Sequence, residues 1–178
     1  MKSTLRMAGF TLLVAGSMAF AQSGTTSPIN NVNVTVAAEA GLTIGGNAVL
    51  TSSGTNFSDY TGTTNFTYFI RTTVGGGAGA ITLKVTSDFS PAGGPSVATP
   101  PTAGDALTYL NTVAAPGTAA SGTQTASTSG VTQVGAFGAD AHSTKAGNAG
   151  STAWTLTNDP LYKTGGYSAV VTYTISAS

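Results

Sequence analysis

The chain contains one histidine, and it is the first place to look for catalytic or metal chemistry. His142 follows Asp140 by two residues, so both side chains would share a face if this segment is extended. Such a pair could activate a serine or contribute to a metal site. A zinc site needs three or four ligands, however, and 6 acidic residues scattered through the chain do not supply them. We therefore interpret His142 as a polar loop residue and predict no catalytic residue, metal ion or cofactor.

The aspartates offer no clearer chemistry, because each lies in or beside a sequence typical of turns. Aspartate in a turn commonly accepts hydrogen bonds from its own backbone. The Asp-x-Asp-x-Asp spacing of a calcium loop is absent, and no carboxylate pair for glycoside hydrolysis stands out. We interpret these residues as turn formers: Asp59, Asp88, Asp105, Asp140 and Asp159.

Two aromatic residues are candidates for ligand stacking. Trp154 is the single tryptophan, and an exposed ring at Trp154 or Tyr162 could provide a platform for a sugar. The alternative for Trp154 is the central core aromatic of a β-sandwich, which is favoured because Leu156 continues the same face of a strand.

Small uncharged residues dominate the composition. The 178 residues include 32 Thr, 27 Ala, 24 Gly and 18 Ser, and only 7% of the residues are charged. Nucleic-acid binding is excluded, because it depends on many basic side chains and the chain has 6. A formal net charge of zero with 40% hydrophobic residues argues against intrinsic disorder, so we expect the chain to fold.

The first 21 residues have the pattern of an export signal. Lys2 and Arg6 precede an apolar stretch, and Ala19-Phe20-Ala21 supplies a cleavage site. We expect an exported mature chain in the periplasm, at the cell surface or outside the cell. We expect no transmembrane segment in the mature chain, because the apolar stretch is too short to span about 30 Å of hydrocarbon. The absence of cysteine excludes disulfides and a lipoprotein anchor.

Alternation of apolar and polar residues with a period of two is the main structural signal after the export signal. It predicts β-strands, and no long amphipathic helix is indicated. The clearest strand is Tyr167–Ser176. We count eight to ten strands, which is typical of an antiparallel β-sandwich. The other strands are expected at 32–37, 42–44, 48–50, 65–73, 81–86, 107–112, 123–129, 131–137 and 153–157.

Glycine and proline divide these strands. The glycine-rich segment Gly75–Gly79 predicts a turn that joins residues 65–73 and 81–86 as a hairpin. Residues 65–73 have large apolar groups on both faces, which predicts a central strand. Ser90–Asp105 contains four prolines and predicts a loop, because proline lacks the N–H that a central strand requires.

The expected domain organisation is a signal peptide (1–21), a flexible leader (22–31) and a single β-sandwich domain (32–178). The start of this domain could also act between molecules. Val32, Val34 and Val36 alternate with polar or small residues, and with Ile29 they form a candidate donor strand for the open sheet edge of a neighbouring copy.

Two short segments resemble families of bacterial surface proteins. Trp154-Thr-Leu156 followed by Asp159-Pro160 resembles the signature of WxL domains, which implies attachment to the cell wall. Gly165–Ile175 and Val32–Ala38 are similar to the last and first strands of spore coat protein U-like and chaperone-usher pilin subunits, although the usual cysteines are absent. Both resemblances imply an immunoglobulin-like sandwich.

These observations lead to two functional hypotheses. The first is a non-enzymatic structural or adhesive protein of the bacterial surface that self-associates as a fibre or coat subunit. The alternative is a module that binds a cell-wall or other polysaccharide. The expected partners are therefore another copy of the chain or a cell-surface polymer.

Overall fold

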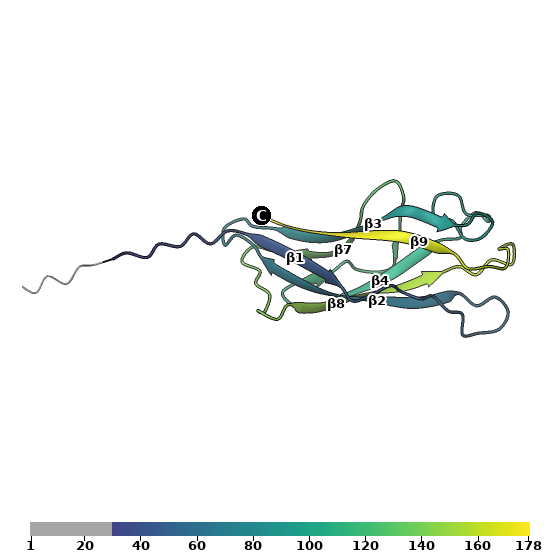
Figure 1. Ribbon diagram of the computed structural model, residues 1–178, viewed down its shortest axis with the longest axis horizontal. Coiled ribbons are helices and arrows are strands. Elements are labelled where there is room, and N and C mark those ends of the chain that lie inside the picture. The colour runs from purple at the N-terminus through teal and green to yellow at the C-terminus, as the bar shows by residue number, and fades with distance from the viewer. Residues whose placement is uncertain (1–29) are drawn as a thin grey trace, which may run out of the picture. The chain divides into compact units, whose positions relative to one another are not determined.

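Period-two alternation produces two layers of antiparallel strands in the computed structural model, which describes residues 30–178 (Figure 1). All regular elements in this part of the chain are strands. They are β1 (Glu39–Ile44), β2 (Tyr60–Arg71), β3 (Gly79–Ser90), β4 (Leu107–Val113), β5 (Thr118–Ala119), β6 (Gln124–Thr125), β7 (Thr132–Phe137), β8 (Asn148–Leu156) and β9 (Ser168–Ala177). No helix capable of spanning a membrane occurs in residues 30–178.

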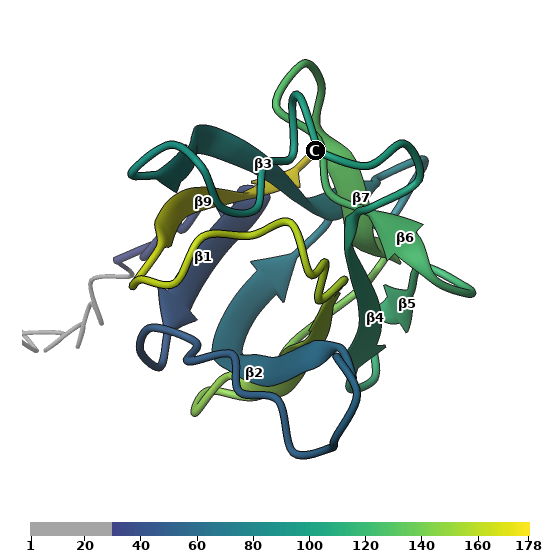
Figure 2. The same cartoon turned by 90° about the vertical axis from the view of Figure 1, so that its right-hand side faces the viewer.

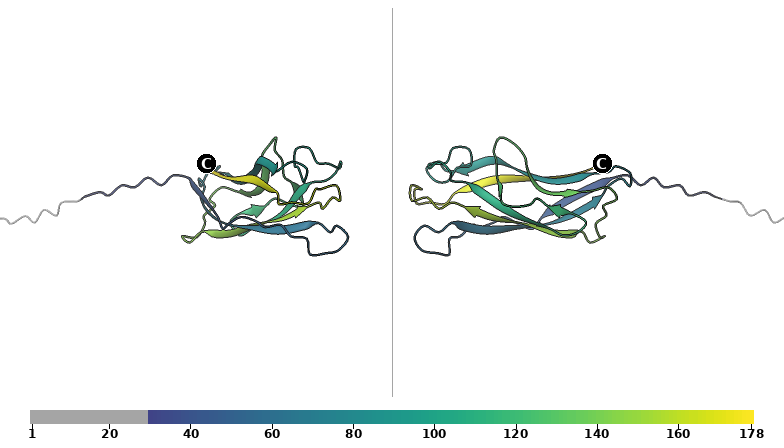
Figure 3. Two further views of the ribbon diagram at one scale, coloured as in Figure 1. Left: turned by 45° about the vertical axis from the view of Figure 1, so that its right-hand side comes forward. Right: turned by 180° about the vertical axis from the view of Figure 1, so that it is seen from behind.

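The strands form one five-stranded and one four-stranded sheet. The five-stranded sheet has the order β1-β2-β8-β4-β6, and the four-stranded sheet has the order β5-β7-β3-β9. All paired strands are antiparallel. Figure 2 shows the two sheets as facing layers, and most connecting loops gather at the ends of the strands (Figure 3). The predicted all-β sandwich is confirmed, and the strand number of nine among the described residues agrees with the expected eight to ten.

The core consists of the side chains that alternate toward the space between the sheets. The strands β2 and β3 contribute most to the core. Each contributes three inward apolar side chains that are at most 3% exposed. They are Phe66, Tyr68 and Ile70 from β2, and Ile81, Leu83 and Val85 from β3. Each such burial contributes about 1.5–3 kcal/mol of transfer free energy. The remaining large core residues come from β4, β7 and β8: Leu107, Tyr109, Val134, Phe137, Trp154 and Leu156.

Threonine is concentrated on the outer face of the five-stranded sheet. Thr61 of β2 pairs with Thr155 of β8, Thr155 pairs with Thr108 of β4, and Thr108 pairs with Thr125 of β6. Neighbouring strands lie about 4.8 Å apart, so these four residues form a continuous row across the sheet. The row explains part of the high threonine content, because β-branched residues suit a strand and their hydroxyls suit solvent.

The predicted hairpin between residues 65–73 and 81–86 is wrong. β2 pairs with β1 and β8, whereas β3 pairs with β7 and β9, so the Gly75–Gly79 connection crosses from one sheet to the other. Alternation specifies which face of a strand is buried, but it does not specify which strand lies beside it. The expectation that residues 65–73 lie in a central strand is confirmed, because β2 lies between β1 and β8.

Two of the predicted strands are absent from the structure. Residues 32–37 have no strand assignment, and regular structure begins at Glu39. Residues 48–50 form no strand, and only Thr51 makes an isolated bridge with Thr61. In both places the alternating residues have no partner strand within the described chain to complete a ladder. The loop predicted for Ser90–Asp105 is observed between β3 and β4, although β3 extends to Ser90.

Candidate functional site

The edges of the two sheets are unequal in length. On one side of the sandwich the edge strands β5 and β6 have two residues each. On the other side β1 has six residues and β9 has ten, and these two strands lie side by side (Figures 1 and 2). Within residues 30–178, each of them has a partner strand on only one of its edges. The long unpaired edges are therefore gathered on a single side.

β9 lacks the features that usually protect an edge strand from pairing. Natural edges commonly contain lysine, proline or an inward-pointing charge. Ser168–Ala177 has no charged residue and no proline. The irregularities in the β3–β9 pair lie between Val85 and Ser90, so β9 is in regular register with β3 from Val171 to Ala177. The edge of this stretch that faces away from β3 has no partner strand within residues 30–178.

The core is incompletely covered beside β9. The inward side chains of β9 are only half-buried, whereas those of the neighbouring β3 are almost fully buried. Leu42 of β1 is half-buried as well, on the facing sheet. Tyr173 still packs on Phe66 of the opposite sheet, with ring centroids 6.0 Å apart. The half-buried residues of β9 are Ala169, Val171, Tyr173, Ile175 and Ala177.

The residues of the candidate donor strand are exposed where the structure describes them. Val32 is 89% exposed, Val34 is 82% exposed and Val36 is 63% exposed. Ile29, the first residue of this candidate strand, lies outside the described residues. An alternating row of valines is costly to leave in water, because each could contribute about 1.5–3 kcal/mol if buried.

Trp154 is buried in the core at 4% exposure. Its ring packs on Tyr109 with centroids 5.2 Å apart, and its Nε1 donates a hydrogen bond to Thr64 Oγ1. The indole therefore has no face open to a ligand from solvent, which supports the core alternative and removes Trp154 from the stacking surface.

Tyr162 lies in a different environment, in the loop between β8 and β9. It is half-buried, and its hydroxyl donates to Asp105 Oδ2 at 3.4 Å. Burial and the negative charge of Asp105 raise the pKa of Tyr162 to about 12. Asp159 accepts hydrogen bonds from Thr102 Oγ1 and from the Leu161 amide, which lower its pKa. The structure does not bring Tyr162 together with Trp154.

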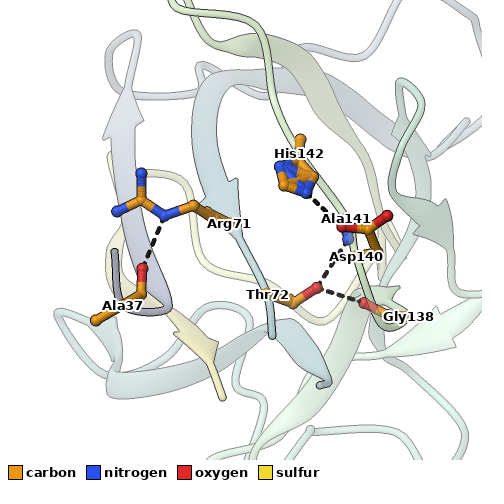
Figure 4. A network of polar contacts seen from close by, with 7 residues as sticks. All are labelled: Ala37, Arg71, Thr72, Gly138, Asp140, Ala141 and His142. Atoms are coloured by element: carbon orange, nitrogen blue, oxygen red, sulfur yellow. Dashed lines mark hydrogen bonds and ion pairs between the residues drawn. The ribbon is translucent and has the colours of Figure 1, made fainter. Parts of the chain in front are cut away.

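His142 and Asp140 do lie in contact (Figure 4), but the segment is not extended as the spacing argument assumed, because Asp140 is in a turn with a φ of 57°. His142 Nε2 lies 2.7 Å from Asp140 Oδ1, and both side chains are more than half exposed. The loop is anchored by Thr72, whose hydroxyl donates to Gly138 O at 2.7 Å and accepts from the Ala141 amide at 2.8 Å. Among residues 30–178, no cluster of three or more potential metal ligands occurs.

A cleft of about 580 Å³ lies next to this loop. Its walls come from the start of β1, the end of β2 and residues 142–145. Arg71 is fixed at the rim, because Nε donates to Ala37 O at 2.7 Å (Figure 4) and Nη2 donates to Glu39 Oε2 at 2.8 Å. The other lining residues with polar or aromatic side chains are Phe69, His142, Ser143, Thr144 and Lys145.

Sequence reasoning did not single out Arg71, Phe69 or Lys145. Phe69 and Arg71 are two residues apart on β2, whereas Lys145 is distant along the chain and lies near them because Arg71 forms a β-bridge with His142. The one sequence signal was the rarity of charge: Arg71 and Lys145 are two of the four Lys and Arg residues after position 29.

Comparison with protein-family models, curated proteins and solved structures finds no match to this chain.

Proposed function

We propose that this protein is a non-enzymatic structural or adhesive subunit of the bacterial surface, with an immunoglobulin-like sandwich, that self-associates by strand addition. In this proposal residues 29–36 of one copy pair with the free edge of β9 in the next copy. The observation that carries the proposal is the open side of the sandwich at β9, in a chain that also has an exposed alternating segment without a partner strand in residues 30–178.

Backbone pairing supplies the first part of the affinity. The ten-residue β9 offers N–H and C=O groups along one edge, and residues 29–36 are long enough to pair with most of them. Strand addition to an open sheet edge is a common mode of recognition. Neither segment contains a charged residue, so no like-charge contact opposes the pairing.

Side-chain burial supplies the second part. Val32, Val34 and Val36 recur at two-residue spacing, so in an added strand they would point to one face. That face would meet the half-buried side chains of β9, such as Val171 and Ile175. The same contact would bury apolar groups of both copies, which makes association favourable for each.

The test measures the assembly state of the exported chain by negative-stain microscopy and size-exclusion chromatography. We expect oligomers or filaments from the unmodified chain and monomers from a variant with Val32, Val34 and Val36 replaced by Thr. The matched control replaces Asn31, Asn33 and Thr35 on the other face by Ser, and it should still assemble.

A second measurement separates pairing between copies from pairing within one copy. A peptide of residues 29–36 should bind the triple-Thr variant and protect amide protons of β9 from hydrogen exchange. Monomers of the unmodified chain at all concentrations, with residues 30–36 protected from exchange, would overturn the proposal.

A further inference from the structure

We infer that the cleft lined by Phe69, Arg71 and Lys145 is a binding site for a neutral pyranose unit of a polysaccharide. This inference is independent of self-association, since it concerns the outer face of the five-stranded sheet near β1 and not the edge of β9. A cleft of about 580 Å³ is within the size range of small-ligand sites, which is about 300–1,000 Å³.

The floor of the cleft is the aromatic ring of Phe69, which lies between Gly41 of β1 and Gly147 of the loop before β8. Phe69 is 38% exposed, and its partner across the β1–β2 ladder is Gly41. On the other side, a Cβ atom at Gly147 would lie 2.9 Å from Phe69 Cζ, so the loop backbone approaches the tip of the ring. Because no side chain at position 41 covers it, the ring is open to the apolar face of a sugar.

The rim provides hydrogen-bond donors above this ring. Arg71 uses Nε and one N–H of Nη2 for hydrogen bonds within residues 30–178, so three of its five N–H donors have no acceptor among these residues and can serve a ligand. The Lys145 ammonium forms no ion pair within the described residues. His142 Nε2 faces Asp140, so its Nδ1 is the ring nitrogen that remains available.

The rim also provides acceptors, and this determines the class of ligand. Glu39 uses Oε2 for Arg71, and its Oε1 makes no hydrogen bond within residues 30–178. The ion pair with Glu39 compensates the charge of Arg71, so Lys145 is the one uncompensated cation among the lining residues. Adjacent hydroxyl groups of a sugar both donate and accept hydrogen bonds. A site with one uncompensated cation, mixed donors and acceptors and an exposed ring suits a neutral pyranose better than a polyanion, whose recognition needs several basic side chains.

The experiment measures binding of neutral cello-, malto- and manno-oligosaccharides to the exported chain by NMR titration and calorimetry, with an oligogalacturonate as the anionic comparison. We expect at least one neutral oligosaccharide to bind, with shifts at Gly41, Phe69 and Lys145. Phe69→Ser should weaken that binding about tenfold or more, because it removes the stacking surface.

Two matched controls test whether a loss of oligosaccharide binding is specific to residues that line the cleft. Phe57 is also exposed, at 59%, but lies outside the cleft, so Phe57→Ser should leave binding unchanged. Lys145→Gln should weaken binding several-fold, whereas Lys163→Gln should not, because Lys163 is not a lining residue.

A further variant fills the cleft without removing a core residue. A Cβ atom at Gly41 would meet Phe69 at 3.8 Å, which is ordinary contact, so Gly41→Thr should fold normally and cover the ring. Binding that survives Gly41→Thr, binding of the oligogalacturonate alone, or no binding of any neutral oligosaccharide at millimolar concentration would each overturn the inference. Phe69→Ser should still assemble, which distinguishes this result from a failure of the proposed strand addition.

Discussion

Trp154 and Thr64 are joined inside the core by a 2.9 Å hydrogen bond from the indole Nε1 to the threonine Oγ1. The two residues come from β8 and β2, which are neighbours in the five-stranded sheet, and they are 4% and 6% exposed. The bond explains why a threonine occupies a core-facing position on β2. It also satisfies the only polar group of the indole, which allows Trp154 to be a core residue.

Replacing Thr64 by Val should destabilise the protein by about 1–3 kcal/mol, because the buried indole N–H loses its acceptor. Urea denaturation monitored by the fluorescence of the single tryptophan measures the change. The control is Thr63→Val on the outer face of the same strand, which should change the free energy of unfolding little. Equal effects of the two substitutions would show that the hydrogen bond contributes nothing.

Two tyrosines should respond in opposite ways to loss of their hydroxyl groups. The Tyr173 hydroxyl is buried beside Thr64 and Thr152 but has no partner with hydrogen-bond geometry among the described residues. The Tyr109 hydroxyl lies 2.7 Å from Thr132 Oγ1 and 3.1 Å from Gln133 O. Tyr109→Phe should therefore cost about 1–2 kcal/mol, whereas Tyr173→Phe should be neutral or stabilising. Thermal denaturation of both variants tests this, and a loss at Tyr173 equal to that at Tyr109 would contradict it.

Glycine is required at one position of β8 by the packing of the opposite strand. A Cβ atom at Gly150 would overlap the ring of Phe66, whereas one at Gly130 would meet nothing within 4 Å. Gly150→Ala should destabilise the protein by about 1–3 kcal/mol through overpacking, and Gly130→Ala should have little effect. Chemical denaturation compares them. A neutral result at Gly150 would mean that the ring of Phe66 moves at little cost.

Stability at acidic pH should depend on Asp88. Burial alone would raise the pKa of Asp88, but hydrogen bonds from the Ser96 hydroxyl and from the amides of Val97, Ala98 and Phe89 outweigh burial and lower it. A depressed pKa stabilises the folded state above the unfolded pKa of 3.8, and that stabilisation is lost as the pH falls through the lower folded value. The free energy of unfolding should therefore decrease below about pH 4.

The Asp88→Asn variant isolates this contribution. It should be less stable than the unmodified chain at pH 7 and should lose part of the decrease on acidification, as followed by urea denaturation at several pH values. Asp59→Asn is the comparison, because Asp59 accepts a single hydrogen bond from the part of the chain that the structure describes, from the Asn158 amide at 3.3 Å. An unchanged pH profile for Asp88→Asn would contradict the assignment.

Alternation along the chain was sufficient to predict most of the strands and their buried faces. Tyr167–Ser176 was predicted within one residue at each end of β9, and the inward residues of β2 and β3 follow from the two-residue period. This succeeds because the direction of successive side chains in a strand is a local property of the backbone. The rarity of charge also predicts, from composition alone, that the chain does not bind nucleic acid, and this stays a prediction.

Tertiary structure alone decided which strands are neighbours and which edges stay open. The Gly75–Gly79 segment crosses between sheets instead of closing a hairpin, because backbone hydrogen bonds are chemically alike for every partner and packing of the whole core selects among them. The same long-range packing brings Phe69 beside Gly41 and Arg71 beside His142, residues separated by tens of positions. No period or motif along the chain predicts these contacts, so the cleft and the open edge of β9 can be identified only from the folded structure.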